Sequence, residues 1–250
     1  MIEVQAVKCP TCGHSFDFSS YIGEEIGDNN VRLTKSSVQR TSWNELDLEI
    51  QAGRAGLLLD VGDKLDFEMK DGTKTSIIVA AINPYGNGVV FSFANILKSA
   101  RMNNRNTNRG GFCKSDMAGM LAEEILPLLP DDLVAVIKSR KITQKQTVSS
   151  SSGAKERLFE RECKLWLPSY TEVFGYDERY SKCDVRDTRF PLFETRSGRV
   201  RYTSDDELSY WWLRSPIIDS STNFWFVGSY GYSYYGYASN ADGVCPCFSI

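Results

Sequence analysis

Alternating apolar and polar residues dominate the first third of the chain and predict β-strands. Apolar side chains alternate with polar ones in three segments with the spacing of half-buried strands, residues 31–33, 46–50 and 65–69. Lys70-Asp71-Gly72 then predicts a hairpin turn. Residues 77–82 are continuously apolar, which predicts a strand buried on both faces, and residues 89–93 follow as the next strand. The order predicts a meander rather than alternating strands and helices.

The first helical pattern begins at Ser115, which is a good N-cap residue. Met117, Leu121 and Ile125 then fall on one helical face, and Pro130 ends the pattern. A short second helix is predicted for residues 131–137. The apolar face of the first helix is typical of a helix packed on a core.

A Ser-x-x-Glu capping box predicts a further short helix from Ser169, with Gly175 at its end. Before it, residues 142–148 alternate weakly and predict a strand. The serine-rich residues 149–153 predict a flexible surface loop. In residues 177–206 the charges balance, which predicts a loop region with a solvated charged face, anchored by the apolar residues Phe190, Leu192 and Phe193.

The tail, residues 210–250, combines two apolar segments with a polar aromatic centre. Residues 210–216 and 243–250 are mostly apolar, and the centre is rich in Tyr, Ser, Gly and Asn. That is the composition of an antibody paratope, in which Tyr supplies stiff amphipathic contact area and the small polar residues supply hydrogen bonds. Composition alone also fits a turn-dense, Gly/Tyr-rich C-terminal segment.

Residue usage in the tail carries a second signal. Residues 217–250 contain no Lys, Glu, Gln or Met and a single Trp, Trp225. The codons of these five residue types all end in a purine. Every other residue of the segment can be encoded by a codon that ends in a pyrimidine. The pattern is that of codons randomised at their first two positions.

Composition excludes several classes of function. The net charge of −3 argues against a nucleic-acid partner, and the locally basic residues 98–114 lack the interleaved aromatic residues of a nucleic-acid platform. That stretch is predicted to be a solvated loop. No apolar run is long enough for a membrane span, and the opening residues do not form a secretory signal. The seven scattered cysteines suit a reducing compartment.

Cys9 and Cys12 have the spacing of half a zinc site. Their two thiolates can bind one side of a tetrahedral Zn²⁺, and His14 is a candidate third ligand. No second Cys-x-x-Cys follows, so three alternatives stay open: a half-site of this chain, a knuckle without metal, and a site completed by a partner chain.

Three motifs carry a resemblance to a known family. They are Trp-Trp-Leu-Arg-Ser-Pro at residues 211–216, Val-x-x-x-Gly at 227–231, and Gly-Val-x-Pro-x-Phe-x-Ile at 243–250. A fourth segment, Leu-Trp-Leu-Pro-Ser-x-x-Glu-Val-Phe-Gly, covers residues 165–175. Together they resemble the variable proteins of diversity-generating retroelements, in which adenines of AAY codons are mutated. The resemblance spans the chain from about residue 53 and is strongest after residue 164.

The resemblance implies an α+β, C-type-lectin-like fold related to the formylglycine-generating enzymes, with a mixed or antiparallel sheet and two main helices. We therefore expect an N-terminal, β-containing segment at residues 1–52, a ligand-binding domain at 53–250 and a variable region at about 217–250. The expected scaffold of the tail is Trp211, Trp212, Leu213, Pro216, Trp225, Val227, Val244, Pro246 and Phe248.

The implied function is non-catalytic binding of a protein or surface ligand. Three locations stay open for the chain: a phage particle, a cell surface and the cytoplasm. A homo-oligomer is left open. The expected contact residues, predicted to project from one contiguous face, are Asp219, Ser220, Asn223, Ser229, Tyr230, Tyr232, Ser233, Tyr234, Tyr235, Tyr237, Ser239 and Asn240.

An enzyme of the formylglycine-generating type, using Cys245 and Cys247 as a redox pair, is the alternative function. Both cysteines occupy free positions of the closing motif, which argues against this role. The calcium motifs of sugar-binding lectins are absent from the sequence, so calcium-mediated sugar binding is not expected. No cofactor is predicted beyond zinc at Cys9 and Cys12.

Overall fold

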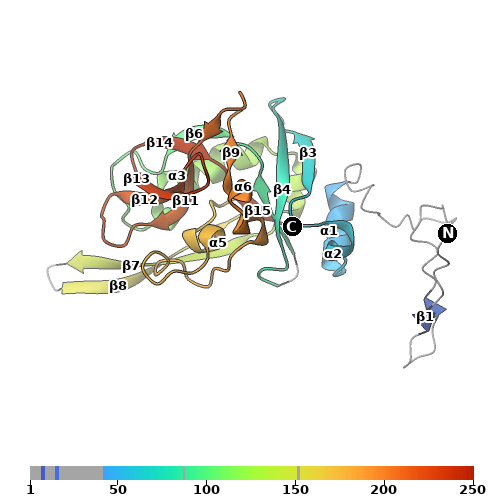
Figure 1. Cartoon of the computed structure of the whole chain (residues 1–250), viewed down its shortest axis with the longest axis horizontal. Coiled ribbons are helices and arrows are strands. Elements are labelled where there is room, and N and C mark those ends of the chain that lie inside the picture. The colour runs from blue at the N-terminus through green and yellow to red at the C-terminus, as the bar shows by residue number, and fades with distance from the viewer. Residues whose placement is uncertain (1–6, 9–14, 17–41, 87, 151–152) are drawn as a thin grey trace. The chain divides into compact units, whose positions relative to one another are not determined.

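The computed structural model describes residues 7–8, 15–16, 42–86, 88–150 and 153–250 (Figure 1). The chain divides into two compact units, residues 1–41 and 42–250. In the first, strand β1 (Val7–Lys8) pairs antiparallel with β2 (Ser15–Phe16). Cys9, Cys12, His14 and the strand predicted at residues 31–33 lie outside the described residues.

A four-stranded antiparallel sheet contains the predicted meander. Its order is β15-β5-β4-β3, where β3 is Lys64–Glu68, β4 is Lys74–Ile82, β5 is Val89–Phe93 and β15 is Cys247–Ser249. The central strand β4 is apolar because both of its faces are covered, and Ile77, Val79 and Ala80 are fully buried. The predicted strands at 65–69, 77–82 and 89–93 are confirmed.

A five-stranded mixed sheet contains most of the tail. Its order is β13-β12-β11-β14-β6, where β6 is Lys98–Arg101, β11 is Trp211–Pro216, β12 is Asn223–Val227, β13 is Ser233–Tyr237 and β14 is Ala241–Val244. Only the β11–β14 pair is parallel within this sheet. The chain passes between the two sheets twice, from β5 to β6 and from β14 to β15. The architecture is α+β, as the sequence predicts.

A long antiparallel hairpin of β7 (Arg140–Ser150) and β8 (Gly153–Cys163) extends away from the two sheets in Figure 1. The strand predicted at 142–148 is confirmed. The predicted serine-rich loop is wrong in extent, because Ser149, Ser150 and Gly153 belong to the strands. Strands β9 (Arg201–Tyr202) and β10 (Leu208–Ser209) form a small separate pair.

The helices are short. They are α1 (Trp43–Gln51), α2 (Ala55–Leu58), α3 (Asp116–Met120), α4 (Asp131–Val136), α5 (Tyr170–Phe174) and α6 (Arg196–Arg199). Single turns are η3 (Phe112–Lys114), η4 (Leu121–Ile125), η5 (Leu126–Leu128) and η6 (Pro191–Glu194). The helix predicted from Ser115 is realised as the run α3-η4-η5, and the Ser115 hydroxyl accepts from the Ala118 N–H at 3.1 Å. Among the described residues, no helix could cross a membrane.

The strand predicted at residues 46–50 is wrong, because these residues form helix α1. Leu46 and Ile50 are buried, whereas Leu48 is 64% exposed. The buried pair is therefore spaced by one helical turn. A capping box of Ser42 and Glu45 begins the helix. Since the second compact unit starts at Ser42, α1 belongs to it and not to the N-terminal segment predicted for residues 1–52.

The basic stretch, residues 98–114, was predicted to be a solvated loop, and this prediction is only partly correct. Lys98–Arg101 forms the edge strand β6, which pairs with β14. Farther along, Asn103, Asn108 and Phe112 are buried. The arginines and lysines of the stretch remain exposed, while two of its four asparagines, Asn103 and Asn108, are buried and support the fold.

Candidate functional site

Strand β11 is the buried base of the tail. All six of its residues are buried, and both tryptophans donate a hydrogen bond from the indole. Trp211 Nε1 donates to the Arg199 carbonyl and Trp212 Nε1 to the Ala100 carbonyl, each at 2.9 Å. The other predicted scaffold residues of the tail are also buried, so the predicted scaffold is confirmed.

Five of the six tyrosines of the tail lie on the surface of the β12–β13 hairpin. Five side chains are between 50% and 69% exposed: Tyr230, Tyr232, Tyr234, Tyr235 and Tyr237. Tyr234, Tyr235 and Tyr237 lie on β13, which is the outer strand of its sheet and has a neighbouring strand on one side only. The predicted exposure is confirmed.

The prediction of one contiguous face is wrong, because successive side chains of a strand point to opposite faces of the sheet. Tyr235 lies edge-on against Trp225, with ring centroids 6.0 Å apart. Tyr234 stacks on Phe226, also at 6.0 Å, on the other face. The exposed rings therefore wrap around the edge of the sheet.

Each face of the hairpin rests on aromatic side chains of the framework. On the first face, Trp225 contacts the rings of Tyr170 and Tyr180, with centroids 4.8 and 5.0 Å away. On the second, Phe226 contacts Tyr210 at 5.5 Å. Tyr210 is 47% exposed and adds to the surface, although the sequence groups it with the apolar anchor.

Residues 217–223 form a turn held by a buried asparagine. The Asn108 side-chain amide donates to the carbonyls of Ile217, Ser220 and Asn223 at 2.8–3.1 Å. The Ser220 hydroxyl accepts from the N–H groups of Thr222 and Asn223. Ser220 and Asn223, predicted as contact residues, are half-buried parts of this turn, whereas Asp219 is exposed.

The other predicted contact residues are small. Asn240 is exposed, and the hydroxyl-bearing residues Ser229, Ser233 and Ser239 are half-buried. The structure thus brings the tyrosines, Asn240 and the three serines into the region of one hairpin and its two ends.

A buried ion cluster lies behind this surface. Arg214 of β11 contacts Glu172 at 2.6 Å and Asp187 at 2.5 Å, and Arg140 contacts the same two carboxylates at 2.6 and 2.9 Å. The Arg140 guanidinium also lies 4.0 Å from the Tyr85 ring centroid. Residues 177–206 were predicted to form a solvated charged face. This prediction is wrong for Asp187, because its carboxylate belongs to the buried cluster.

A third carboxyl, Asp184, is buried next to the cluster. It accepts hydrogen bonds from the Ser215 hydroxyl at 2.6 Å and from the Thr171 N–H and hydroxyl, each at 3.1 Å. Three buried carboxyls thus face two guanidiniums, which leaves one negative charge without a partner if all are ionised. Burying such a charge is costly.

The excess of buried carboxyl groups over guanidiniums shifts the pKa values of these carboxyl groups. Burial, reinforced by Glu172 and Asp184 and only partly opposed by Arg214, raises the pKa of Asp187 to about 7. Burial also raises the pKa of Asp184. For Glu172, burial is outweighed by Arg140 and Arg214, which hold its pKa at about 2.

We expect the protein to be less stable at pH 8 than at pH 5. Because the pKa of Asp187 is raised on folding, the folded state binds more protons than the unfolded state between about pH 4 and 7, and stability falls as pH rises through that window. Asp187→Asn should remove about 2–3 kcal/mol of this decrease. Urea denaturation at both pH values measures it.

Asp205→Asn is the matched control, because Asp205 is exposed. It should leave the pH dependence unchanged. If the Asp187 and Asp205 variants show the same dependence as the parent, the excess proton does not reside in the cluster.

Residues 87–250 match the model of DUF6273, which is described as a domain of unknown function. The match covers well over half of the chain. The chain belongs to the DUF6273 family. No curated protein and no solved structure matches it. The matched residues contain the whole five-stranded sheet and the ion cluster apart from Tyr85, whereas β3 and β4 precede the match and complete the other sheet.

The cysteines of the DUF6273 domain are buried thiols. Cys113, Cys163, Cys183, Cys245 and Cys247 are all free and buried. Burial raises the pKa of Cys113 to about 12 and also raises the pKa of Cys247. Cys245 Sγ donates to the Phe93 carbonyl at 2.9 Å and lies 3.3 Å from Arg201 Nε. These are the surroundings of structural cysteines, since a reactive thiol needs a thiolate and access.

No group of three or more metal-ligating side chains with metal-site geometry occurs in the described part of the chain. The zinc prediction rests on Cys9 and Cys12, which lie outside that part, so it stays a prediction.

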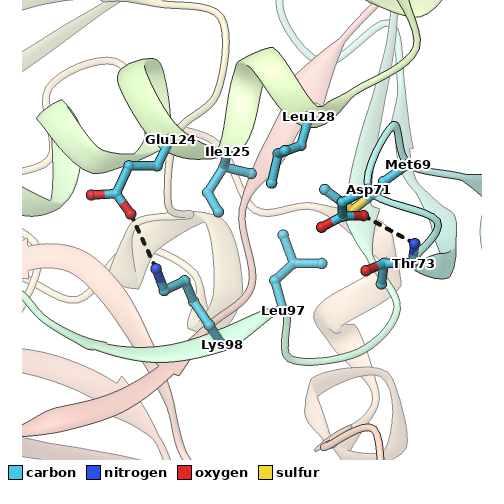
Figure 2. Close-up of a pocket in the computed structure, with 8 residues that line it drawn as sticks. All are labelled: Met69, Asp71, Thr73, Leu97, Lys98, Glu124, Ile125 and Leu128. Carbon is cyan, nitrogen blue, oxygen red and sulfur yellow. Dashed lines mark hydrogen bonds and ion pairs between the residues drawn. The ribbon is translucent and has the colours of Figure 1, made fainter.

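A separate surface hollow of about 250 Å³ lies between the β3–β4 turn and the η4-η5 run (Figure 2). Its lining is Met69, Asp71, Thr73, Leu97, Lys98, Glu124, Ile125 and Leu128. Lys98 pairs with Glu124 at 3.1 Å, and Asp71 accepts from the Thr73 N–H at 3.0 Å. Because the charged and polar groups at the rim are already paired in this way, only the small apolar floor of the hollow is available to a ligand.

Proposed function

We propose that this DUF6273 domain is a non-catalytic binding module with a C-type-lectin-like fold, and that it contacts a protein or surface ligand through the β12–β13 hairpin. The observation that carries the proposal is the contrast within the tail. Five of its six tyrosines are 50–69% exposed, while strands β11 and β15 and the second half of β14 are largely buried. Exposed tyrosines with small polar neighbours supply contact area at low entropic cost.

We further propose that a retroelement diversifies this surface. Side chains that project from an edge hairpin can change with little effect on folding, since exposed substitutions usually cost less than about 0.5 kcal/mol. The missing purine-ended codon types of residues 217–250 support the same proposal. Ser220 and Asn223 are left out of the proposed contact surface because they hold the 217–223 turn.

A displayed library tests the binding function. Codons for Tyr230, Tyr232, Tyr234, Tyr235 and Tyr237 are randomised, and the library is selected against a panel of unrelated proteins. Binders should emerge, and they should unfold within a few degrees of the parent. A matched library that randomises five buried residues of β11 should lose folded protein. A tyrosine library that is equally unfolded overturns the proposal.

The genome tests the diversification. A reverse-transcriptase gene should lie nearby, with a near-copy of the tail-coding DNA in which adenines occupy the varied codons. If neither is present, the surface is a fixed binding site and the retroelement part of the proposal is wrong.

A further inference from the structure

The turn of the tail hairpin packs directly on helix α6. Gly231 has a φ of +77°, and a Cβ there would lie 2.6 Å from the Arg196 carbonyl oxygen. Only glycine tolerates both the conformation and the close approach. Arg199 Nε donates to the Gly231 carbonyl at 2.9 Å. The turn and α6 therefore form one continuous surface.

Three arginines converge at this junction. Arg189 and Arg199 both donate to the Phe193 carbonyl, at 3.3 and 2.6 Å. Arg196 lies over the exposed ring of Tyr232, 4.8 Å from its centroid, and donates to the Tyr232 hydroxyl. Burial, and after it the positive charges of Arg189 and Arg196, lower the pKa of Arg199, as expected for like charges close to this guanidinium.

In the ranges that the structure describes, no carboxylate forms an ion pair with these three arginines. Arg179 provides the contrast. It also lies over a tyrosine, 5.5 Å from the Tyr180 centroid, but Asp177 accompanies it at 3.7 Å. Arg189 and Arg196 are exposed and Arg199 is half-buried, so a ligand can reach all three. Excess positive charge held together by neutral carbonyls attracts an anion.

We propose that Arg189, Arg196 and Arg199 form an anion-binding subsite of the tail surface, and that the ligand is an acidic protein segment whose carboxylates bind there. This inference rests on the proposed binding function. Planar guanidiniums bind carboxylates with two parallel hydrogen bonds, and the rings of Tyr230 and Tyr232 offer apolar contact to the same segment. A protein fits better than a nucleic acid, because the chain carries a net charge of −3.

The subsite has a consequence for the diversified surface. Residues 189–199 lie outside the proposed variable region of 217–250, so every variant of the tail keeps the same three arginines. A constant basic edge supplies attraction to acidic ligands, and the variable tyrosines then select among them. Charge at an interface contributes mainly to encounter and register.

The test uses a fluorescein-labelled peptide of alternating Glu and Ala, titrated into the full chain at low salt with fluorescence anisotropy as the readout. The parent should bind it, and the double variant Arg189→Gln/Arg196→Gln should bind at least about tenfold more weakly, as expected for lost hydrogen bonds to a charged group. Arg179→Gln removes the same kind of charge from a paired arginine and should bind like the parent.

Three results overturn the inference: no binding by the parent, equal binding by the double variant, or binding of a Gln-Ala peptide as tight as that of the Glu-Ala peptide. A DNA duplex that binds more tightly with the same arginine dependence overturns the choice of a protein ligand. The displayed tyrosine library separates this inference from the proposed function. If it yields binders while the peptide test fails, only the subsite falls. If the peptide test succeeds and the library yields none, only the diversified tail falls.

Discussion

Glu172→Gln is expected to lower the free energy of unfolding by about 3–5 kcal/mol, the usual cost of breaking a buried ion pair. The carboxylate of Glu172 accepts from Arg140 and Arg214 at 2.6 Å, from the Tyr85 hydroxyl at 2.7 Å and from the Ser169 N–H at 2.9 Å. A glutamine amide would turn a donor toward these donors. It would also leave two buried guanidiniums with less negative charge.

Glu45→Gln is the control that isolates the effect of burial. Glu45 closes the same kind of capping box, at the start of α1, but there its bond to the Ser42 N–H at 3.0 Å is exposed. Its substitution should cost about 1 kcal/mol or less. Chemical denaturation at pH 7 compares the two. Equal losses would mean that Glu172 acts only as a helix cap and that the ion cluster does not hold the fold.

Trp212→Ala is expected to cost about 3–5 kcal/mol, whereas Tyr235→Ala should cost about 0.5 kcal/mol or less. Trp212 is fully buried, and its loss opens a cavity and leaves the Ala100 carbonyl without its donor. Tyr235 is 62% exposed and keeps a single ring contact, with Trp225. Thermal or urea unfolding of both variants measures the difference without a ligand.

Tyr234→Ala is a second surface variant, on the opposite face of the hairpin. It tests whether both faces are free of the core, because Tyr234 stacks on Phe226 and is 53% exposed. A loss in either tyrosine variant as large as that in Trp212→Ala would make the hairpin an ordinary core element. The proposed binding surface would then lose its physical basis.

Local signals in the sequence predicted much of this fold. The capping box of Ser169 and Glu172 is formed as expected, with the Glu172 N–H donating to the Ser169 hydroxyl at 3.0 Å. The apolar run of β4 is buried, and the tyrosines of the tail are exposed. In each case the residues that carry the signal are close together in the chain.

Features with an ambiguous sequence pattern, or with residues far apart in the chain, were predicted wrongly or not at all. Leu46, Leu48 and Ile50 fit the period of a strand, but Leu46 and Ile50 alone also fit one face of a helix, and the capping box at Ser42 was the cue that decides for a helix. Asn108 holds a turn more than a hundred residues away, and no pattern within either segment reports it. The charged residues of the ion cluster, Arg140, Glu172, Asp187 and Arg214, lie on four separate segments, so the sequence could not predict the cluster for the same reason. A balanced set of charges looks solvated until the fold brings its members together.

The route of the tail through both sheets sets an order for folding on the ribosome. β14 pairs with β6 and β15 with β5, so strands made early in synthesis wait for partners encoded more than a hundred residues later. Pairings of such long sequence separation form slowly. Until residues 241–250 emerge, the apolar strand β5 has an open edge, which makes the nascent chain prone to aggregation. We therefore expect the yield of native protein to depend on translation speed and chaperone supply.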